Sequence, residues 1–435
     1  MSSGTSKLAN DSLASSEANT RIRRDEGMGM LNEQAARQKI LDGLARVDFA
    51  QQKVLAIIPD RTRTCPMPLL FQTVVDALRS RVKQLDFMIA LGTHPAMSVS
   101  AIQQWVGISA EDAKTRYRSI QFFNHEWNNR DALQQIGTLS AEEIGQLTGG
   151  LMREDVDVSI NRHVFAYDRL LMIGPTFPHE VVGFSGGNKY LFPGISGPDV
   201  LNMFHWLGAL ITNAEIIGTE DTAVRRVINR AAAMVAIPKT MISLVVSKAG
   251  LHDLFIDTPE AAYAKAAALS SRIHIRTVQK PFNTVLSLAP TMYADIWTAG
   301  KCMYKLERVV ADGGELIIYA PHIQDVSVIH GETIEAIGYH VRDYFVKQWD
   351  RFKHIPRGVL AHSTHVRGAG NFENGVERPR IGVTLATRIP AEICRAINLG
   401  YRDPDQINVA AWEGQEDEGV LVVPNAGEVL YTIAR

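Results

Sequence analysis

Short apolar runs alternate with stretches of helical spacing along the first half of the chain. The runs VLAIIP (54–59) and DFMIALGT (86–93) lack polar alternation, and the apolar residues of PLLFQTVVDALRSRV (68–82) between them have helical spacing. Strands that are buried on both faces have such continuous runs, whereas half-exposed strands alternate. The pattern therefore predicts a β-α-β arrangement and a mostly parallel sheet flanked by helices.

The same patterns place the remaining elements and divide the chain. Further strands are expected at 119–125, 156–160, 169–175 and 241–247, and further helices at 31–47, 198–211, 221–236 and 259–272. A second series has expected strands at 284–290, 314–321 and 359–365, with helices at 296–310 and 333–352. A polar, helix-poor segment at 273–282 separates the two series. We therefore predict an α/β fold of two α/β domains with mostly parallel sheets, 29–275 and 280–402, with the active site in the interdomain cleft.

Composition and charge exclude several classes of protein. The 45 Lys and Arg residues nearly balance 47 Asp and Glu residues, so no broad basic field is available for nucleic acid or an anionic membrane surface. The three cysteines are far apart, which predicts neither a disulfide framework nor a cysteine zinc site. Residues 1–28 lack the apolar block of a secretory signal and are expected to form a flexible tail. These features predict a cytoplasmic protein.

Polar residues follow two of the predicted strands directly. The turn Asp60-Arg61-Thr62-Arg63 comes after the first strand, and its guanidinium groups suit a carboxylate or phosphate ligand, although an exposed turn with a local ion pair fits equally. His94 follows the strand at 86–93, where a neutral imidazole could accept a proton. Alone, such a histidine is more often a surface or capping residue.

A long loop at 175–197 has five glycines and three prolines in 23 residues, which excludes a helix interior or a central strand. It encloses His179 and Lys189, and Lys189 follows Gly186-Gly187-Asn188. Such glycines let backbone amides approach a phosphate, and the lysine supplies charge or a nucleophilic amine. The loop matches neither a Walker motif nor a Rossmann fingerprint, and a purely structural glycine-rich loop is the alternative.

Two further candidates lie beyond this loop. His205 falls sixteen residues after Lys189 within an expected helix, where a lone histidine is more often a core residue that donates to a backbone carbonyl than a metal ligand. Asp295 begins the expected helix at 296–310, whose N-terminal amides together with Lys301 would suit a carboxylate. The spacing of His322, His330, His362 and His365 does not resemble a zinc triad.

Taken together, these motifs resemble the lactate racemase family. The resemblance rests on DxxR at Asp60 and Arg63, on GTHPAMS, on HEVVGFSGGNKYLFPGISG and on the interval from Lys189 to His205, and it covers nearly the whole chain after residue 28. It implies a racemase or epimerase that uses a nickel-pincer nucleotide, the nickel complex of pyridinium-3,5-bisthiocarboxylic acid mononucleotide. It also implies that residues 403–435 return toward the N-terminal domain and that cofactor-synthesis enzymes are partners.

The resemblance also implies roles for individual residues. His94 and His179 would be the two general acid/bases, Asp60 would orient His94, and Lys189 would hold the cofactor while His205 ligates nickel. Arg63 and Lys301 would hold the substrate together with Trp297 and Thr298. The remaining expected cofactor contacts are Thr62, Ser185, Gly186 and Gly187.

Proton-coupled hydride transfer fits these residues. Direct deprotonation next to a carboxylate builds a second negative charge, whereas moving the hydrogen as hydride to a cofactor leaves a 2-oxo acid. The two enantiomers present their hydroxyl groups on opposite sides, so two bases are needed. Trp297 and Thr298 replace the Tyr-Gln of the lactate enzymes, and Asn188 replaces a frequent basic residue. We therefore expect a 2-hydroxy acid other than lactate, larger or a sugar acid such as an aldonate.

Two other classes of function fit part of the same pattern. Lys189 could hold pyridoxal phosphate as a Schiff base, with the glycine-rich loop around its phosphate. The chain could also be a noncatalytic protein that binds a nucleotide or a hydroxy acid. Nickel content separates the first alternative from the racemase, and turnover separates the second.

Overall fold

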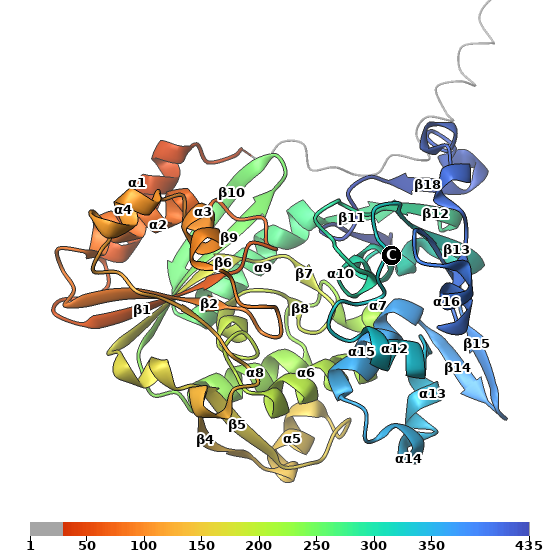
Figure 1. The fold of residues 1–435 in the computed structure, drawn as a ribbon, viewed down its shortest axis with the longest axis horizontal. Coiled ribbons are helices and arrows are strands. Elements are labelled where there is room, and N and C mark those ends of the chain that lie inside the picture. The colour runs from red at the N-terminus through yellow and green to blue at the C-terminus, as the bar shows by residue number, and fades with distance from the viewer. Residues whose placement is uncertain (1–28, 435) are drawn as a thin grey trace, which may run out of the picture.

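The computed structural model describes residues 29–434, so the tail predicted for residues 1–28 lies outside the described residues. The first half folds around a six-stranded sheet of order β10-β9-β6-β1-β2-β3 (Figure 1). Every neighbouring pair in it is parallel except β9 with β10. The strands are β1 (Lys53–Pro59), β2 (Gln84–Ala90), β3 (Phe122–Asn124), β6 (Arg169–Pro175), β9 (Lys239–Ser247) and β10 (Gly250–Asp257). The mostly parallel sheet predicted from the apolar runs is therefore confirmed.

Helices cover both faces of this sheet because its strands are apolar on both sides. In β1, Leu55 and Ile57 belong to one buried cluster, and Val54, Ala56 and Ile58 belong to another. Figure 1 shows three helices above the strands, α1 (Glu33–Ala45), α2 (Met67–Leu78) and α3 (Val99–Val106), with α4 (Ala110–Lys114) beside them. Below the strands lie α5 (Ala141–Thr148), α6 (Pro198–Ile211) and α8 (Ala223–Ala233). The helix α9 (Pro259–His274) packs against β9 and β10.

The strand expected at 156–160 forms outside the main sheet. It is β5 (Val156–Asn161), which pairs antiparallel with β4 (Leu133–Leu139) in a separate two-stranded sheet. Burial alternates along the first residues of β5, as expected where one face of a strand is covered. One further short antiparallel pair in this half lies in the loop after β6 and is formed by β7 (Pro178–His179) and β8 (Gly183–Phe184).

The second half contains a five-stranded parallel sheet of order β17-β16-β13-β12-β18. Its strands are β12 (Phe282–Leu288), β13 (Val310–Ala320), β16 (Gly382–Thr387), β17 (Gly400–Tyr401) and β18 (Val420–Val423). The strands expected at 284–290 and 314–321 are confirmed. Near the C-terminus, β19 (Leu430–Ile433) pairs with β11 (Ile275–Val278), and a hairpin joins β14 (Gly370–Glu373) to β15 (Val376–Pro379).

Three predictions of secondary structure in the second half were wrong. The expected helix at 333–352 is three short helices, α12 (Gly331–Ile337), α13 (Arg342–Val346) and α14 (Trp349–Phe352). Gly338 has a φ of 74° and ends α12, because a left-handed residue cannot continue a helix. The expected helix at 296–310 is likewise divided, into α10 (Ile296–Ala299), α11 (Lys301–Tyr304) and a 3-10 turn.

The third error concerns the strand expected at 359–365, which is part of the helix α15 (Arg357–Arg367). Pro356 stands at its N-cap, a position where proline does not disturb a helix. Every residue from Val359 to Val366 is buried, so the segment has no exposed face to reveal a helical period. A short continuous apolar run does not distinguish a buried helix from a buried strand.

One buried apolar cluster extends through both halves of the chain. It joins β1 and α6 of the first half to β13 and α15 of the second. The helices α6 and α15 pack against each other, and the Trp206 and Trp349 rings stack with their centroids 5.5 Å apart. Arg357 at the start of α15 also forms two hydrogen bonds with Glu154, which lies just before β5 in the first half. Among residues 29–434, no helix combines the length and the apolar character needed to cross a membrane.

Two buried histidines of this scaffold make its stability depend on pH. His125 lies against the carbonyl of Ser196 and the amide of Asn161, and His274 lies against the Val246 carbonyl and the Ser270 hydroxyl. Burial lowers the pKa of each imidazole to about 4. An unfolded histidine titrates near pH 6.5, so the unfolded chain binds more protons below that pH. Each neutral, buried histidine should therefore contribute its full share of stability above about pH 6.5. Between pH 6.5 and pH 4 the free energy of unfolding should decrease by up to about 1.4 kcal/mol per pH unit for each histidine.

Urea unfolding between pH 7 and pH 4 measures this slope. His125→Gln and His274→Gln should each flatten it, since glutamine cannot bind the proton. His354→Gln, at an exposed position, is the control and should leave the slope unchanged. Equal slopes in the wild type and both buried-site variants would contradict the prediction.

Candidate active site

One pocket gathers most of the residues expected from the sequence. Its wall takes side chains from both halves of the chain, between Pro59 and His205 and between Trp297 and His365. The expected residues that line it are Asp60, Arg63, His94, His179, Ser185, Gly186, Lys189, His205, Trp297, Thr298 and Lys301. Thr62 and Gly187 do not line it, so their contact with a cofactor stays a prediction. Arg61 is exposed and also lies outside the wall.

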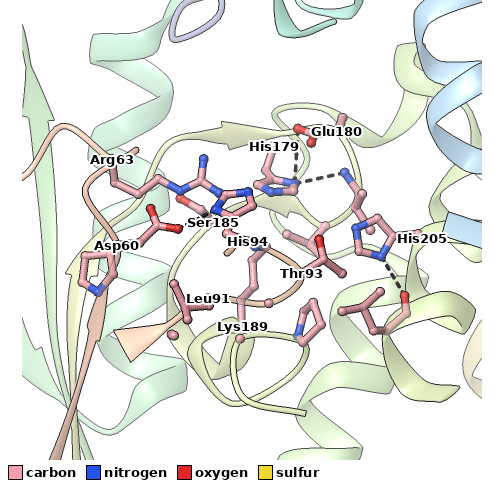
Figure 2. A pocket seen from close by; sticks show the side chains of 18 of the residues that line it. Asp60, Arg63, Leu91, Thr93, His94, His179, Glu180, Ser185, Lys189 and His205 are labelled. Carbon is pink, nitrogen blue, oxygen red and sulfur yellow. Dashed lines mark hydrogen bonds and ion pairs between the residues drawn. The ribbon is translucent and has the colours of Figure 1, made fainter. Parts of the chain in front are cut away.

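Strand order explains why these residues meet. Asp60 follows β1, His94 lies after β2 and His179 lies after β6, and β1 pairs in parallel with both β2 and β6. The carboxyl ends of neighbouring parallel strands lie at one edge of a sheet, where ligands of α/β folds bind. Figure 2 shows Asp60 and Arg63 on one side of the pocket and His205 on the other, with Lys189 extending between them.

Asp60 fixes the tautomer of His94. Its Oδ2 lies 2.5 Å from His94 Nδ1, and its Oδ1 accepts hydrogen bonds from the backbone and the hydroxyl of Thr62. Burial alone would raise the pKa of the Asp60 carboxyl, but the His94 hydrogen bond and the nearby positive charges hold it well below its usual value. An ionised carboxylate only accepts, so His94 donates through Nδ1–H. In the neutral ring, Nε2 of His94 then has the lone pair that can take a proton.

His179 rests in the opposite tautomer. The backbone N–H of Val181 donates to His179 Nδ1 at 3.1 Å, so the proton of a neutral ring lies on Nε2. Burial lowers the pKa of His179 well below its usual value, the Glu180 carboxylate opposes this shift, and the charges of Lys189 and Arg63 add to it. Glu180 Oε2 lies 3.4 Å from the same Nδ1. One histidine is thus ready to accept a proton at Nε2 and the other to donate a hydrogen bond from it.

Lys189 has the character of a nucleophilic amine. Burial lowers its pKa to about 7; the charges of Arg63, Arg225 and Lys301 favour this shift, and Glu180 opposes it. Gly186 has a φ of 87°, and a Cβ there would lie 2.2 Å from the Thr176 hydroxyl, so the loop that carries Lys189 requires glycine at this position. A lysine that loses its proton near pH 7 is nucleophilic in neutral solution.

Two cations from different elements suit an anionic ligand. Arg63 comes from the turn after β1, and Lys301 comes from α11 of the second half; both line the pocket. Burial and the charge of Arg63 lower the pKa of Lys301 to about 8. The N-terminal amides of α10 were expected to bind a carboxylate ligand. Asp295 itself caps that helix instead, because its side chain accepts a hydrogen bond from the Thr298 N–H. Lys301, and not a free helix end, therefore supplies the positive charge from this side.

His205 has one ring nitrogen available for a ligand. Its Nδ1–H donates to the Leu201 carbonyl at 2.7 Å, so in the neutral ring Nε2 carries no proton and its lone pair is free to bind a ligand. Histidines that ligate metals are oriented by such a second hydrogen bond. Within residues 29–434, no group of three or more His, Cys, Asp or Glu side chains could hold a metal ion. A metal at His205 would therefore need most of its ligands from a cofactor.

Five ionisable residues of the pocket wall were not assigned from the sequence: Glu180, Tyr190, Tyr304, His362 and His365. Glu180 directly follows His179, and that adjacency was the available signal. His362 packs against Trp297 with ring centroids 4.2 Å apart. Its three-residue spacing from His365 places both on one face of α15, but this signal required a helix where a strand was expected.

Comparisons with known proteins give consistent relatives. Residues 33–218 match the model of the lactate racemase N-terminal domain. The lactate racemase of Thermoanaerobacterium thermosaccharolyticum is 27% identical over 282 residues, which are 63% of this chain and 61% of the relative. The aligned segment thus spans less than two thirds of that protein.

Two solved structures share the fold. A structural-genomics protein from Thermotoga maritima superposes with a TM-score of 0.85 and 34% identity, over 94% of this chain and 100% of that one. The apoprotein of the lactate racemase from T. thermosaccharolyticum superposes with a TM-score of 0.66 and 19% identity, over 95% of this chain and 94% of that one. The second likeness shows the fold alone.

Proposed function

Because the chain belongs to the lactate racemase family, we propose that it inverts C2 of a 2-hydroxy acid, as a racemase or epimerase that uses a nickel-pincer nucleotide. The observation that carries the proposal is the pair His94 and His179, which rest in opposite tautomers in one pocket. Lys189, His205 and two cations line the same pocket.

The residues present fit this cofactor. His205 offers a single imidazole lone pair, and Lys189 offers an amine that is readily un-ionised. Lys189 would hold the nucleotide, His205 would ligate its nickel, and Ser185 and Gly186 would contact it from the pocket wall. When bound, the cofactor supplies an acceptor that takes the C2 hydrogen as hydride and returns it.

The chain's own residues hold the substrate and move its hydroxyl proton. Arg63 and Lys301 bind the carboxylate, so that C2 is fixed in the pocket. His94 takes the hydroxyl proton of one enantiomer at Nε2, and the charge that develops on its ring is stabilised by Asp60. For the other enantiomer, His179 takes the hydroxyl proton at Nε2 from its other tautomer, in which the ring proton lies on Nδ1 and faces Glu180 Oε2 at 3.4 Å. Proton loss as the C2 hydrogen leaves gives a 2-oxo acid, which is reduced again after it presents its other face.

The side chain of the substrate would meet residues of the second half. Trp297, Thr298 and His362 line the pocket there, and His362 lies against the Trp297 ring. An indole and an imidazole form a wide wall with hydrogen-bonding capacity, which suits a side chain larger or more polar than a methyl group. We therefore propose a larger 2-hydroxy acid or a sugar acid such as an aldonate as the substrate.

A panel of 2-hydroxy acids tests the function. Protein co-produced with the cofactor-synthesis enzymes should contain nickel in a 1:1 ratio and should convert single stereoisomers into mixtures, fastest for acids larger than lactate. Chiral chromatography measures the conversion. A metal-free protein whose visible absorption is abolished by hydroxylamine would indicate a Schiff-base enzyme, and nickel-loaded protein that binds acids without turnover would indicate a binding protein. Either result would contradict the proposal.

A further inference from the structure

Arg225 carries a buried charge behind the loop that holds Lys189. It lies on α8, is 3% exposed and does not line the pocket. Its guanidinium donates to the carbonyl of Gly186 at 3.0 Å and to that of Phe184 at 2.5 Å. Its centre lies 3.9 Å from the centroid of the Tyr263 ring. Among residues 29–434, no salt bridge joins it to a carboxylate, although the charge of Glu260 opposes the lowering of its pKa by burial. Burying an arginine without a salt bridge costs folding free energy. We therefore expect its contacts with the loop to have a role beyond stability.

These contacts determine the shape of the loop ahead of Lys189. The two carbonyls flank Ser185, and the next residues, Gly186 and Gly187, have φ values of 87° and 60°. Tyr263 is itself anchored, because its hydroxyl donates to the Glu220 carbonyl. The planar fork of an arginine can hold two carbonyls at once, which a lysine ammonium does with less geometric control. Arg225 thus connects the glycine turn to the rigid scaffold of α8 and α9.

The charge of Arg225 also acts on Lys189 from outside the pocket. The groups that act on the Lys189 amine are Arg63 and Lys301 on the pocket wall, Glu180 on the same wall, and Arg225 behind the loop. Lys189 in turn affects His179 and His205. An anionic ligand would neutralise Arg63 and Lys301, whereas Arg225 lies outside the wall and keeps its charge. Arg225 is therefore the one of these three cations whose effect on the amine a pocket ligand does not cancel.

We propose that Arg225 is a positioning residue for Lys189, which fixes the loop through the Phe184 and Gly186 carbonyls and, as a permanent cation, keeps the amine ready to react. The inference rests on the proposed function only for what the amine holds. The ionisation and the position of the amine are properties of the cofactor-free protein and can be tested without turnover.

The test is the pH dependence of Lys189 acylation in cofactor-free protein. Trace acetic anhydride is applied between pH 6 and pH 10, and the modified Lys189 peptide is quantified by mass spectrometry. The wild type should reach half of its plateau near pH 7. Arg225→Gln should move the midpoint to higher pH, with the rate at pH 6 falling about 10-fold for each pH unit of displacement. Arg225→Lys keeps the charge but loses the fork, so its main change should be in the plateau rate.

The neighbouring arginine provides a matched control. Arg226 lies on the same helix, is more exposed and pairs with Asp221 at 2.9 Å, so Arg226→Gln should retain the wild-type midpoint and plateau. A cooperative thermal transition confirms that each variant is folded. If Arg225→Gln does not fold, the plateau rate of Lys189 acylation in Arg225→Lys tests the proposal. A folded Arg225 variant with both the midpoint and the plateau of the wild type overturns the proposal, whatever the hydroxy-acid panel shows.

Discussion

Replacing His94 with alanine in the cofactor-loaded protein is expected to lower kcat for inversion of a 2-hydroxy acid by about 10²–10⁴-fold. Asp60 holds His94 Nδ1 at 2.5 Å and leaves Nε2 as the free base, so alanine removes the group that takes the hydroxyl proton. KM should change much less, because Arg63 and Lys301 still bind the carboxylate. Chiral chromatography of both stereoisomers over time measures kcat and KM.

The companion variants separate the base from its orienting partner. His179→Ala should cause a loss of the same order, since each stereoisomer needs both histidines over a full inversion. Asp60→Asn can present a donor to Nδ1 and thereby favour the tautomer of His94 that has no free Nε2. Because His94 itself is retained, this variant should reduce kcat less than His94→Ala does. His354→Ala, at an exposed position, should retain full activity. Normal inversion by a variant that lacks both His94 and His179 would refute the mechanism.

The second large effect concerns cofactor retention. Lys189→Ala, co-produced with the cofactor-synthesis enzymes, is expected to lose nearly all bound nickel and to show background activity only. Lys189 reaches into the pocket from a loop held by glycines of positive φ, and alanine removes the group that we propose holds the nucleotide. Nickel per chain by mass spectrometry of the metal and the intact mass of the protein are the two measurements.

Lys189→Arg distinguishes a covalent bond from a contact between charges. Arginine keeps the positive charge but its guanidinium is not a nucleophile near neutral pH, so a protein that needs the bond should lose the added mass with both variants. Nickel retained with arginine but not with alanine would indicate an ionic contact. Equal nickel and equal mass in the wild type and Lys189→Ala would show that Lys189 does not hold the cofactor.

The first half of the fold was accessible from the sequence because its strands are buried on both faces. An apolar run such as VLAIIP that is flanked by helical stretches indicates a buried parallel strand. Parallel pairing then brings the residues that follow neighbouring strands to one edge of the sheet. The sequence alone therefore predicts that the loops carrying Asp60, His94 and His179 lie at one edge of the sheet. The second half was less accessible, because α15 is buried on every side and lacks a period that reveals its type.

Side-chain direction was the part of the site that local sequence could not provide. Arg61 and Arg63 are two residues apart in one turn, yet only Arg63 lines the pocket. Asp295 was expected to begin a helix with free amides, but its own carboxylate caps that helix. His362 and His365 reach the pocket through the packing of α15 on α6, a contact between segments about 150 residues apart in the chain. Such contacts are decided by tertiary packing, which motif spacing does not encode.

The apolar cluster that continues from α6 into α15 determines how the molecule melts. Because both halves share one buried surface, neither can lose its structure without uncovering part of the other, and thermal denaturation should be a single cooperative transition. A chain truncated near residue 275 would leave the apolar face of α6 open to solvent and would tend to aggregate. The pocket then exists only in the fully folded protein, so any ligand that fills it stabilises both halves together by mass action.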